Sequence, residues 1–149
     1  MTNTDTDFHV YNQQLIDLIA PVEKQGRLEP GTNVYSATAV SPVCGSRVDM
    51  DLITDATGRI TSIGCAAEAC ALTKGVLAIF LKKAPGLTRT EIADAASSFE
   101  NWLDGKADEL PDHWHDLNIL APARSYTARH DSMMLPFRAS LKALDKQGQ

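Results

Sequence analysis

The chain has 149 residues, the length of one domain, and 44% of them are hydrophobic while 22% are charged. This balance is typical of a globular protein that buries a core, and no stretch approaches the roughly 18 apolar residues of a membrane span. The net charge of -5 argues against a large surface for nucleic acid. We therefore expect a single domain, residues 1–149, that binds neither nucleic acid nor a membrane.

The N-terminus is acidic and polar, unlike a secretion signal or a basic transit peptide. We expect residues 1–7 to form a disordered tail and the protein to lie in the cytoplasm, where thiols stay reduced. The odd number of cysteines, three in all, agrees with a reducing compartment.

A helix is predicted after this tail. Apolar residues recur at helical spacing from Phe8 to Ile19, so residues 8–20 are expected to form an amphipathic helix. Pro21 and the glycines and prolines that follow it predict a loop.

Strand-like patterns follow the loop. The three predicted strands cover residues 33–40, 47–54 and 59–63. Asp55 to Gly58 form a tight turn between the last two, with Gly58 available for positive φ. Connections this short suit an antiparallel meander rather than βαβ units.

Helical spacing begins after the third strand. A helix is predicted from Ala66 to about Lys83, and Thr88 with Glu91 forms a capping box that begins another. That second helix is expected to run to about residue 103, with Gly105 as its stop.

The last third of the chain completes the layout. A short helix is predicted around residues 114–120, and a final helix over residues 128–144 that Pro136 interrupts. The predicted fold class is therefore α+β, a small three-stranded antiparallel sheet packed against helices.

Cys65 lies where the predicted strand gives way to the predicted helix. If the helix begins at Ala66, the helix dipole lowers the pKa of the Cys65 thiol and makes it the most reactive of the three. The alternative is a small buried cysteine that closes a strand–helix junction.

Cys44 lies between two predicted strands, where Gly45 lets the backbone turn and the thiol project. In a meander the chain runs out and back between Cys44 and Cys65, so both are expected at the same end of the sheet. Their spacing is not that of a CxxC pair, so spacing alone is a weak signal for zinc.

Cys70 and His130 are further candidates. Cys70 is five positions after Cys65, too far for a disulfide if both are helical, and a core role is favoured. It approaches Cys65 only if Cys65 lies outside the helix. His130, near the start of the last predicted helix, is the one histidine that we consider near a site.

The order of several short motifs resembles a known family. Ser41-Pro42-Val43-Cys44-Gly45 resembles the Asn-Pro-x-Cys-Gly-Asp motif of the NifU/IscU-type iron–sulfur cluster assembly scaffolds, most closely the SufU-like branch. Ile63-Gly64-Cys65-Ala66 resembles their second cysteine motif. The segment Arg129 to Phe137 resembles Arg-x-x-Cys-x-x-Leu-x-Trp, with Ser132 at the third cysteine position. The resemblance spans nearly the whole chain and implies the same α+β fold.

The resemblance also implies a site, with two departures. Family members hold iron, a nascent iron–sulfur cluster or zinc with three cysteines and an aspartate. Cys44 and Cys65 fill the first two positions, whereas Ser46 replaces the aspartate and Ser132 the third cysteine. A serine hydroxyl is a poor ligand for iron or zinc. Asp131, His130 or Cys70 remain open as the additional ligand, and Cys44, Cys65 and Ser132 are expected to converge.

Three functions follow from this resemblance. The first is a non-enzymatic scaffold of iron–sulfur cluster assembly that binds metal at a degenerate site, with a cysteine desulfurase and acceptor proteins as partners. The second is a sulfur acceptor that takes persulfide sulfur from the desulfurase. The third is a metal-free interaction module that retains the fold.

Overall fold

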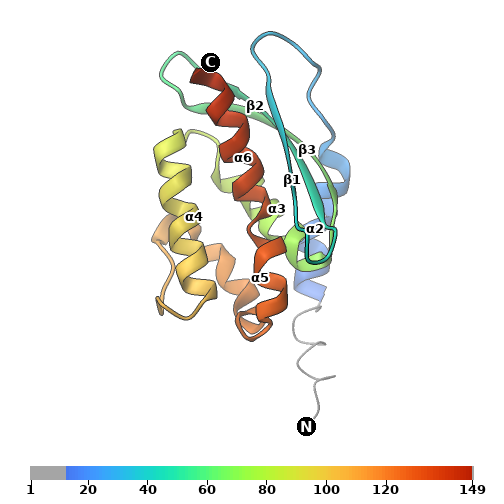
Figure 1. Ribbon diagram of the computed structural model, residues 1–149, viewed down its shortest axis with the longest axis vertical. Coiled ribbons are helices and arrows are strands. Elements are labelled where there is room, and N and C mark those ends of the chain that lie inside the picture. Colours follow the sequence, from blue (N-terminus) through green and yellow to red (C-terminus); the bar gives the residue numbers. More distant parts are fainter. Residues whose placement is uncertain (1–12, 149) are drawn as a thin grey trace.

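The computed structural model describes residues 13–148. Three antiparallel strands form one sheet in the order β1-β2-β3, and they are β1 (Tyr35–Val40), β2 (Arg47–Thr54) and β3 (Ile60–Glu68). Helices cover one face of this sheet, with α6 packed across β1 and β2 (Figure 1). The α+β class and the three-stranded antiparallel sheet are therefore confirmed.

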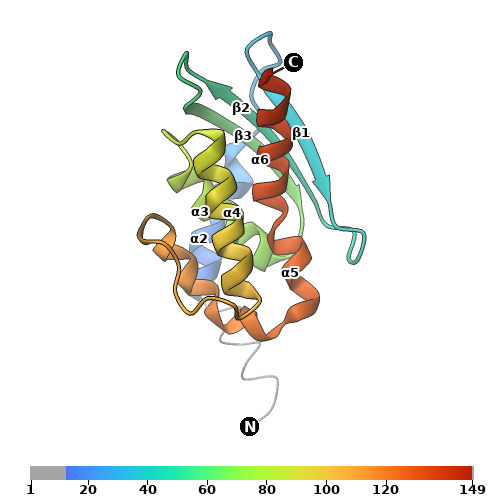
Figure 2. The same ribbon diagram turned by 60° about the vertical axis from the view of Figure 1, so that its left-hand side comes forward.

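The helical elements gather on the same side of the sheet (Figure 2). In chain order they are α2 (Gln13–Gln25), α3 (Ala71–Lys83), α4 (Arg89–Leu103), the 3-10 segment η1 (Asp112–Ser125), α5 (Thr127–Met133), α6 (Leu135–Asp145) and the 3-10 turn η2 (Lys146–Gly148). Within residues 13–148, none of these helices has the length and apolar character needed to span a membrane.

The first predicted helix differs from the structure at its C-terminal end. The predicted tail and residues 8–12 lie outside the described residues. The helix α2 continues through Pro21 to Gln25, although a proline removes one helical hydrogen bond. Val22, next to Pro21, is buried, and its packing holds the final turn against the core.

The later helices follow the predicted signals closely. Thr88 and Glu91 form a reciprocal capping box at the start of α4, and Gly105 has a φ of +77° just after its end. The final helical stretch is divided into α5 and α6, with Pro136 in the first turn of α6, where a missing N–H costs no hydrogen bond.

The junction between β3 and α3 differs from the prediction. The strand continues to Glu68 and α3 begins at Ala71, so the predicted helix start at Ala66 is wrong. The cause is pairing with β2, in which Arg47 lies opposite Glu68 and Val48 opposite Ala67. An eight-residue β2 therefore holds this stretch in the extended conformation despite its helix-favouring alanines.

The two faces of the sheet are chemically different. Val48, Met50 and Leu52 alternate along β2 and are fully buried against the helices. Beyond them, aromatic rings from four helical elements form the centre of the core. Phe80 contacts Phe137 edge to face at 5.5 Å between ring centroids, and the core aromatics are Phe80, Phe99, Trp102, Trp114 and Phe137.

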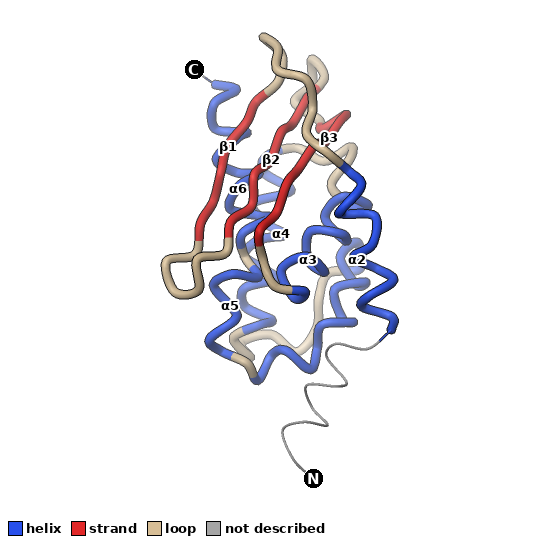
Figure 3. The backbone as a smooth tube through the Cα atoms, turned by 90° about the vertical axis from the view of Figure 1, so that its right-hand side faces the viewer, coloured by secondary structure: helices blue, strands red, loops and turns tan. Residues whose placement is uncertain are grey.

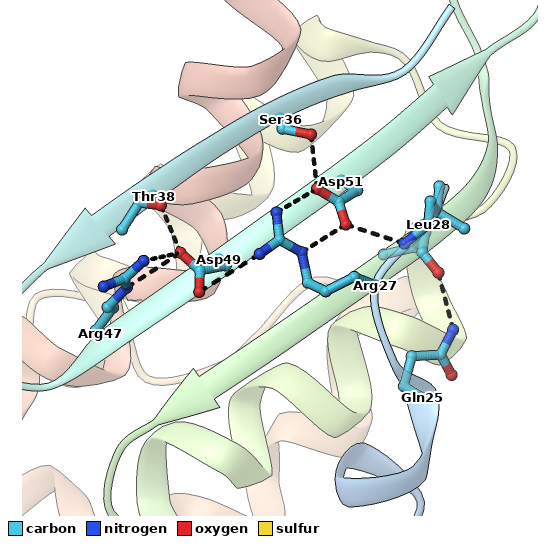
Figure 4. Close-up of polar contacts among 9 residues, drawn as sticks. Gln25, Arg27, Leu28, Ser36, Thr38, Arg47, Asp49 and Asp51 are labelled. Carbon is cyan, nitrogen blue, oxygen red and sulfur yellow. Dashed lines mark hydrogen bonds and ion pairs between the residues drawn. The ribbon is translucent and has the colours of Figure 1, made fainter. Parts of the chain in front are cut away.

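The other face carries a polar network (Figure 4). Asp51 is 1% exposed and accepts hydrogen bonds from Arg27 Nε at 2.7 Å, the Leu28 N–H at 3.0 Å and Ser36 Oγ at 2.6 Å. The Arg27 guanidinium, above all, lowers the pKa of Asp51 to about 2. This network fixes the loop after α2 against the sheet.

Gly64 faces this loop. A Cβ atom on Gly64 would lie 2.4 Å from the Leu28 nitrogen, which leaves no room for a side chain. Close packing between the loop and β3 therefore explains why a glycine precedes Cys65.

Candidate thiol site

The loop between β1 and β2 presents Cys44. The Ser41 N–H donates to the Ser46 carbonyl and the Gly45 N–H donates to the Ser41 carbonyl, both at 2.8 Å. Gly45 has a φ of +75°, in the left-handed region that glycine adopts without steric cost. These bonds close a compact loop from which the Cys44 side chain is exposed to solvent.

The hydroxyl of Ser46 contacts the Cys44 thiol. Ser46 Oγ lies 3.1 Å from Cys44 Sγ, and Ser46 is only 7% exposed. Hydrogen bonding to the Ser46 side chain is the largest influence that lowers the pKa of Cys44 to about 7, with smaller contributions from Ser41 and Ser132. Because the thiolate is the nucleophile, this lowered pKa favours the nucleophilic form of Cys44 near neutral pH.

A carboxylate connects this loop to α5. Ser41 Oγ donates to Asp131 Oδ2 at 2.7 Å, and Arg138 Nη1 donates to Asp131 Oδ1 at 2.6 Å. Arg138 first, and Ser41 second, lower the pKa of Asp131. Both Asp131 oxygens therefore have donors within the protein. Sequence reasoning did not identify Ser41 as a site residue, although its position before Pro42 in the motif was a usable signal.

Ser132 lies beside the loop on α5. It is fully buried, donates to the Arg129 carbonyl at 3.0 Å, and makes a small contribution to the lowered pKa of the Cys44 thiol. The structure thus brings Cys44, Ser46, Asp131 and Ser132 together at one end of the sheet.

Cys70 lies at the same end of the sheet. It is the residue that precedes α3, and the start of α3, the β1–β2 loop and α5 are neighbours in Figure 3. Burial alone would raise the pKa of the Cys70 thiol, but hydrogen bonds from Thr73 and Leu72 and the charge of Arg129 outweigh it, so the pKa is lowered. The half-buried Cys70 therefore occupies the helix-start position that the sequence analysis assigned to Cys65.

Cys65 lies elsewhere. Cys65 pairs with Met50 of β2. Met50 is three residues beyond Arg47, the first residue of β2, so Cys65 lies about 10 Å from that end of the sheet. Its side chain belongs to the hydrophobic core and is 2% exposed. Burial, with a smaller effect from Asp51, raises the pKa of its thiol to about 11. The expected low pKa of Cys65 is therefore wrong, because the residue is in a strand rather than at a helix start.

His130 makes its polar contacts with η1 and the end of α4. Its Nε2 is 3.3 Å from the Ala123 carbonyl and its Nδ1 is 3.5 Å from Asp104 Oδ1. These contacts lie against η1 and the end of α4, so His130 serves the packing of α5.

The donors around Cys44 do not match the requirements of iron or zinc. Both metals favour thiolate, imidazole or carboxylate ligands, whereas the side chain in contact with Cys44 is the hydroxyl of Ser46. Over residues 13–148, no three or more His, Cys, Asp or Glu side chains are grouped so as to hold a metal ion. The arrangement instead suits a single exposed thiolate.

Comparison with known proteins agrees with the fold. The N-terminal part of a nitrogen-fixing NifU-like protein from Brucella abortus superposes with a TM-score of 0.83 at 25% identity, covering 95% of this chain and 96% of that one. A putative iron–sulfur cluster assembly scaffold for the SUF system from Fervidobacterium islandicum has a TM-score of 0.78 at 18% identity, covering 92% and 98%. No protein-family model and no curated protein matches the sequence.

Proposed function

This chain belongs to the NifU/IscU-type family of iron–sulfur cluster assembly scaffolds, and from that premise we propose that it accepts sulfur from a cysteine desulfurase on Cys44. The protein then acts as a carrier and not as an enzyme, and passes the sulfur to acceptor proteins of cluster assembly.

The exposed, hydrogen-bonded thiol of Cys44 carries this proposal. Sulfur acceptance needs one accessible thiolate and no metal. The Cys44 thiolate attacks the terminal sulfur of the desulfurase persulfide, the sulfur–sulfur bond of that persulfide breaks, and the desulfurase cysteine leaves as a thiolate. A pKa of about 7 supplies a large thiolate fraction at neutral pH.

The surface around Cys44 supports contact with a protein partner. Val43, directly before Cys44 in the loop, is 70% exposed, and Val40, at the end of β1, is 55% exposed. Two large exposed aliphatic side chains beside a reactive thiol favour transient docking of the partner that delivers sulfur.

A second candidate is binding of iron, a nascent cluster or zinc, and the position of Cys70 at the same end of the sheet favours it. This function requires a further ligand, because Asp131 is engaged by Arg138 and Ser41. The hydroxyls of Ser46 and Ser132 are weak substitutes for a carboxylate and a thiolate. A metal-free interaction module is the third candidate, and a reactive thiol gives no support to it.

A sulfur-transfer assay tests the proposal. The reduced protein is incubated without oxygen with a SUF-type cysteine desulfurase and cysteine that carries radioactive sulfur. We expect wild type and Cys65→Ser to acquire label that a dithiol removes, and Cys44→Ser to acquire none. Equal labelling of Cys44→Ser and wild type, or an unlabelled wild type, would overturn the proposal.

A further inference from the structure

Two thiols lie at one end of the sheet, near the same turn of α5: the Cys44 loop is bonded to α5 through Ser41, and α3, which begins directly after Cys70, packs against α5. Ser132 on that turn helps to lower the pKa of the Cys44 thiol, and the charge of Arg129 helps to lower the pKa of the Cys70 thiol. Ser132 and Arg129 are three positions apart and are joined by the bond from Ser132 Oγ to the Arg129 carbonyl, so both belong to one helical turn. The thiols of Cys44 and Cys70 are therefore both influenced by this one turn.

The backbone segments that carry Cys44 and Cys70 are both held in place near this turn. Ser41 ties the Cys44 loop to α5 through Asp131. On the other side, Arg47 pairs with Glu68, so the chain reaches Cys70 only two residues after the paired end of the sheet. Cys70 is half-buried, whereas Cys44 is exposed, so Cys44 meets a partner first.

We propose that Cys70 is the resolving thiol for a persulfide on Cys44, and that its attack releases sulfide. This inference rests on the proposed sulfur acceptance at Cys44. The Cys70 thiolate attacks Cys44 Sγ, the inner sulfur of the persulfide, and a Cys44–Cys70 disulfide bond forms. The bond between Cys44 Sγ and the outer sulfur breaks, and its electron pair leaves with that sulfur as hydrosulfide.

Electrons balance in this step without an added reductant. The two cysteine sulfurs are oxidised to the disulfide, while the outer sulfur is reduced to sulfide. A dithiol reductant then returns both cysteines to thiols for the next cycle. Cys65 cannot take this role, because it is 2% exposed within the core.

The substitution Cys70→Ser tests the step without disturbing the fold, because serine is a favoured residue before a helix and preserves the start of α3. Cys65→Ser is the matched control. Each full-length protein is loaded by a cysteine desulfurase without oxygen and then separated from cysteine. Circular dichroism first establishes that both variants are folded.

We expect wild type and Cys65→Ser to release sulfide equal to the persulfide lost, and to yield a Cys44–Cys70 disulfide by peptide mapping. Cys70→Ser should keep its persulfide over the same time. The inference is overturned, with sulfur acceptance intact, if Cys70→Ser releases sulfide as fast as wild type or if the outer sulfur moves onto Cys70. If Cys44 never acquires sulfur, both the inference and the proposed function fail.

Discussion

The hydroxyl of Ser46 lies 3.1 Å from the thiol of Cys44, at the position where the family motif has an aspartate. A carboxylate there would repel a thiolate unless a metal cation lay between them, whereas a hydroxyl donates a hydrogen bond to the thiolate. This contact favours a Cys44 thiolate without a metal cation beside it, as the proposed sulfur acceptance requires.

The first prediction concerns this contact. Ser46→Ala removes the largest influence on the Cys44 thiol, so its pKa should rise from about 7 toward the ordinary 9.0. The rate of Cys44 alkylation, followed from pH 6 to 10, should therefore have a higher midpoint in the variant. Ser97→Ala, on the exposed side of α4, is the control and should leave the midpoint unchanged. Identical midpoints in Ser46→Ala and wild type would contradict this assignment.

The second prediction is the order in which the thiols react. Timed iodoacetamide labelling of the native protein near pH 7 should modify Cys44 first, Cys70 next and Cys65 last. Exposure and low pKa favour Cys44, while burial and a pKa of about 11 protect Cys65. The sequence alone predicted that Cys65 would react first, whereas the structure predicts that it reacts last. Labelling of Cys65 ahead of Cys70 would show that β3 opens readily.

The third prediction concerns metal. Wild type should bind zinc weakly, and Ser132→Cys should strengthen zinc binding by about 10- to 100-fold. Loss of a residue that only hydrogen-bonds a metal ligand already changes metal affinity by this factor, so an added thiolate ligand should change it at least as much. A titration against a competing chelator measures the change. Ser140→Cys is the matched control, because Ser140 is also fully buried and also donates to a carbonyl three positions earlier. Stoichiometric zinc in wild type after chelator treatment would disprove weak binding.

The fourth prediction concerns Gly64. Gly64→Ala should lower the free energy of unfolding by about 1–3 kcal/mol, because its Cβ would meet the backbone nitrogen of Leu28 at 2.4 Å. Gly31→Ala is the control, since its Cβ would lie 3.4 Å from the side-chain oxygen of Asn33. Urea unfolding measures both variants. Equal stabilities would mean that the loop moves away from β3 at little cost.

Much of the fold could be predicted because local signals and tertiary structure agree. The turn at residues 55–58, the capping box of Thr88 and the break at Pro136 each depend on a few neighbouring residues. The end of β3 could not be predicted from helix propensity, since its alanines favour a helix. The alternation of Ile63, Cys65 and Ala67, together with the length of β2, was the signal that pointed to a longer strand.

The site was predictable only in part for a related reason. The family motif led to Cys44, Ser46 and Ser132, which lie together in the structure. The positions of Cys65 and Cys70 depend on where the strand ends, and that error placed the wrong thiol at the helix start. The engagement of Asp131 by Arg138 is a contact within the folded domain that no sequence spacing reveals.

The most direct test of sulfur acceptance at Cys44 locates the first sulfur atom that enters the protein. Wild-type protein is mixed with a persulfide-loaded cysteine desulfurase for a single turnover, quenched with an alkylating reagent and mapped by peptide mass spectrometry. We predict that the earliest modified peptide carries one added sulfur on Cys44, with none on Cys65. First appearance of the sulfur on Cys65 or Cys70, or no added sulfur on any cysteine, would contradict the account.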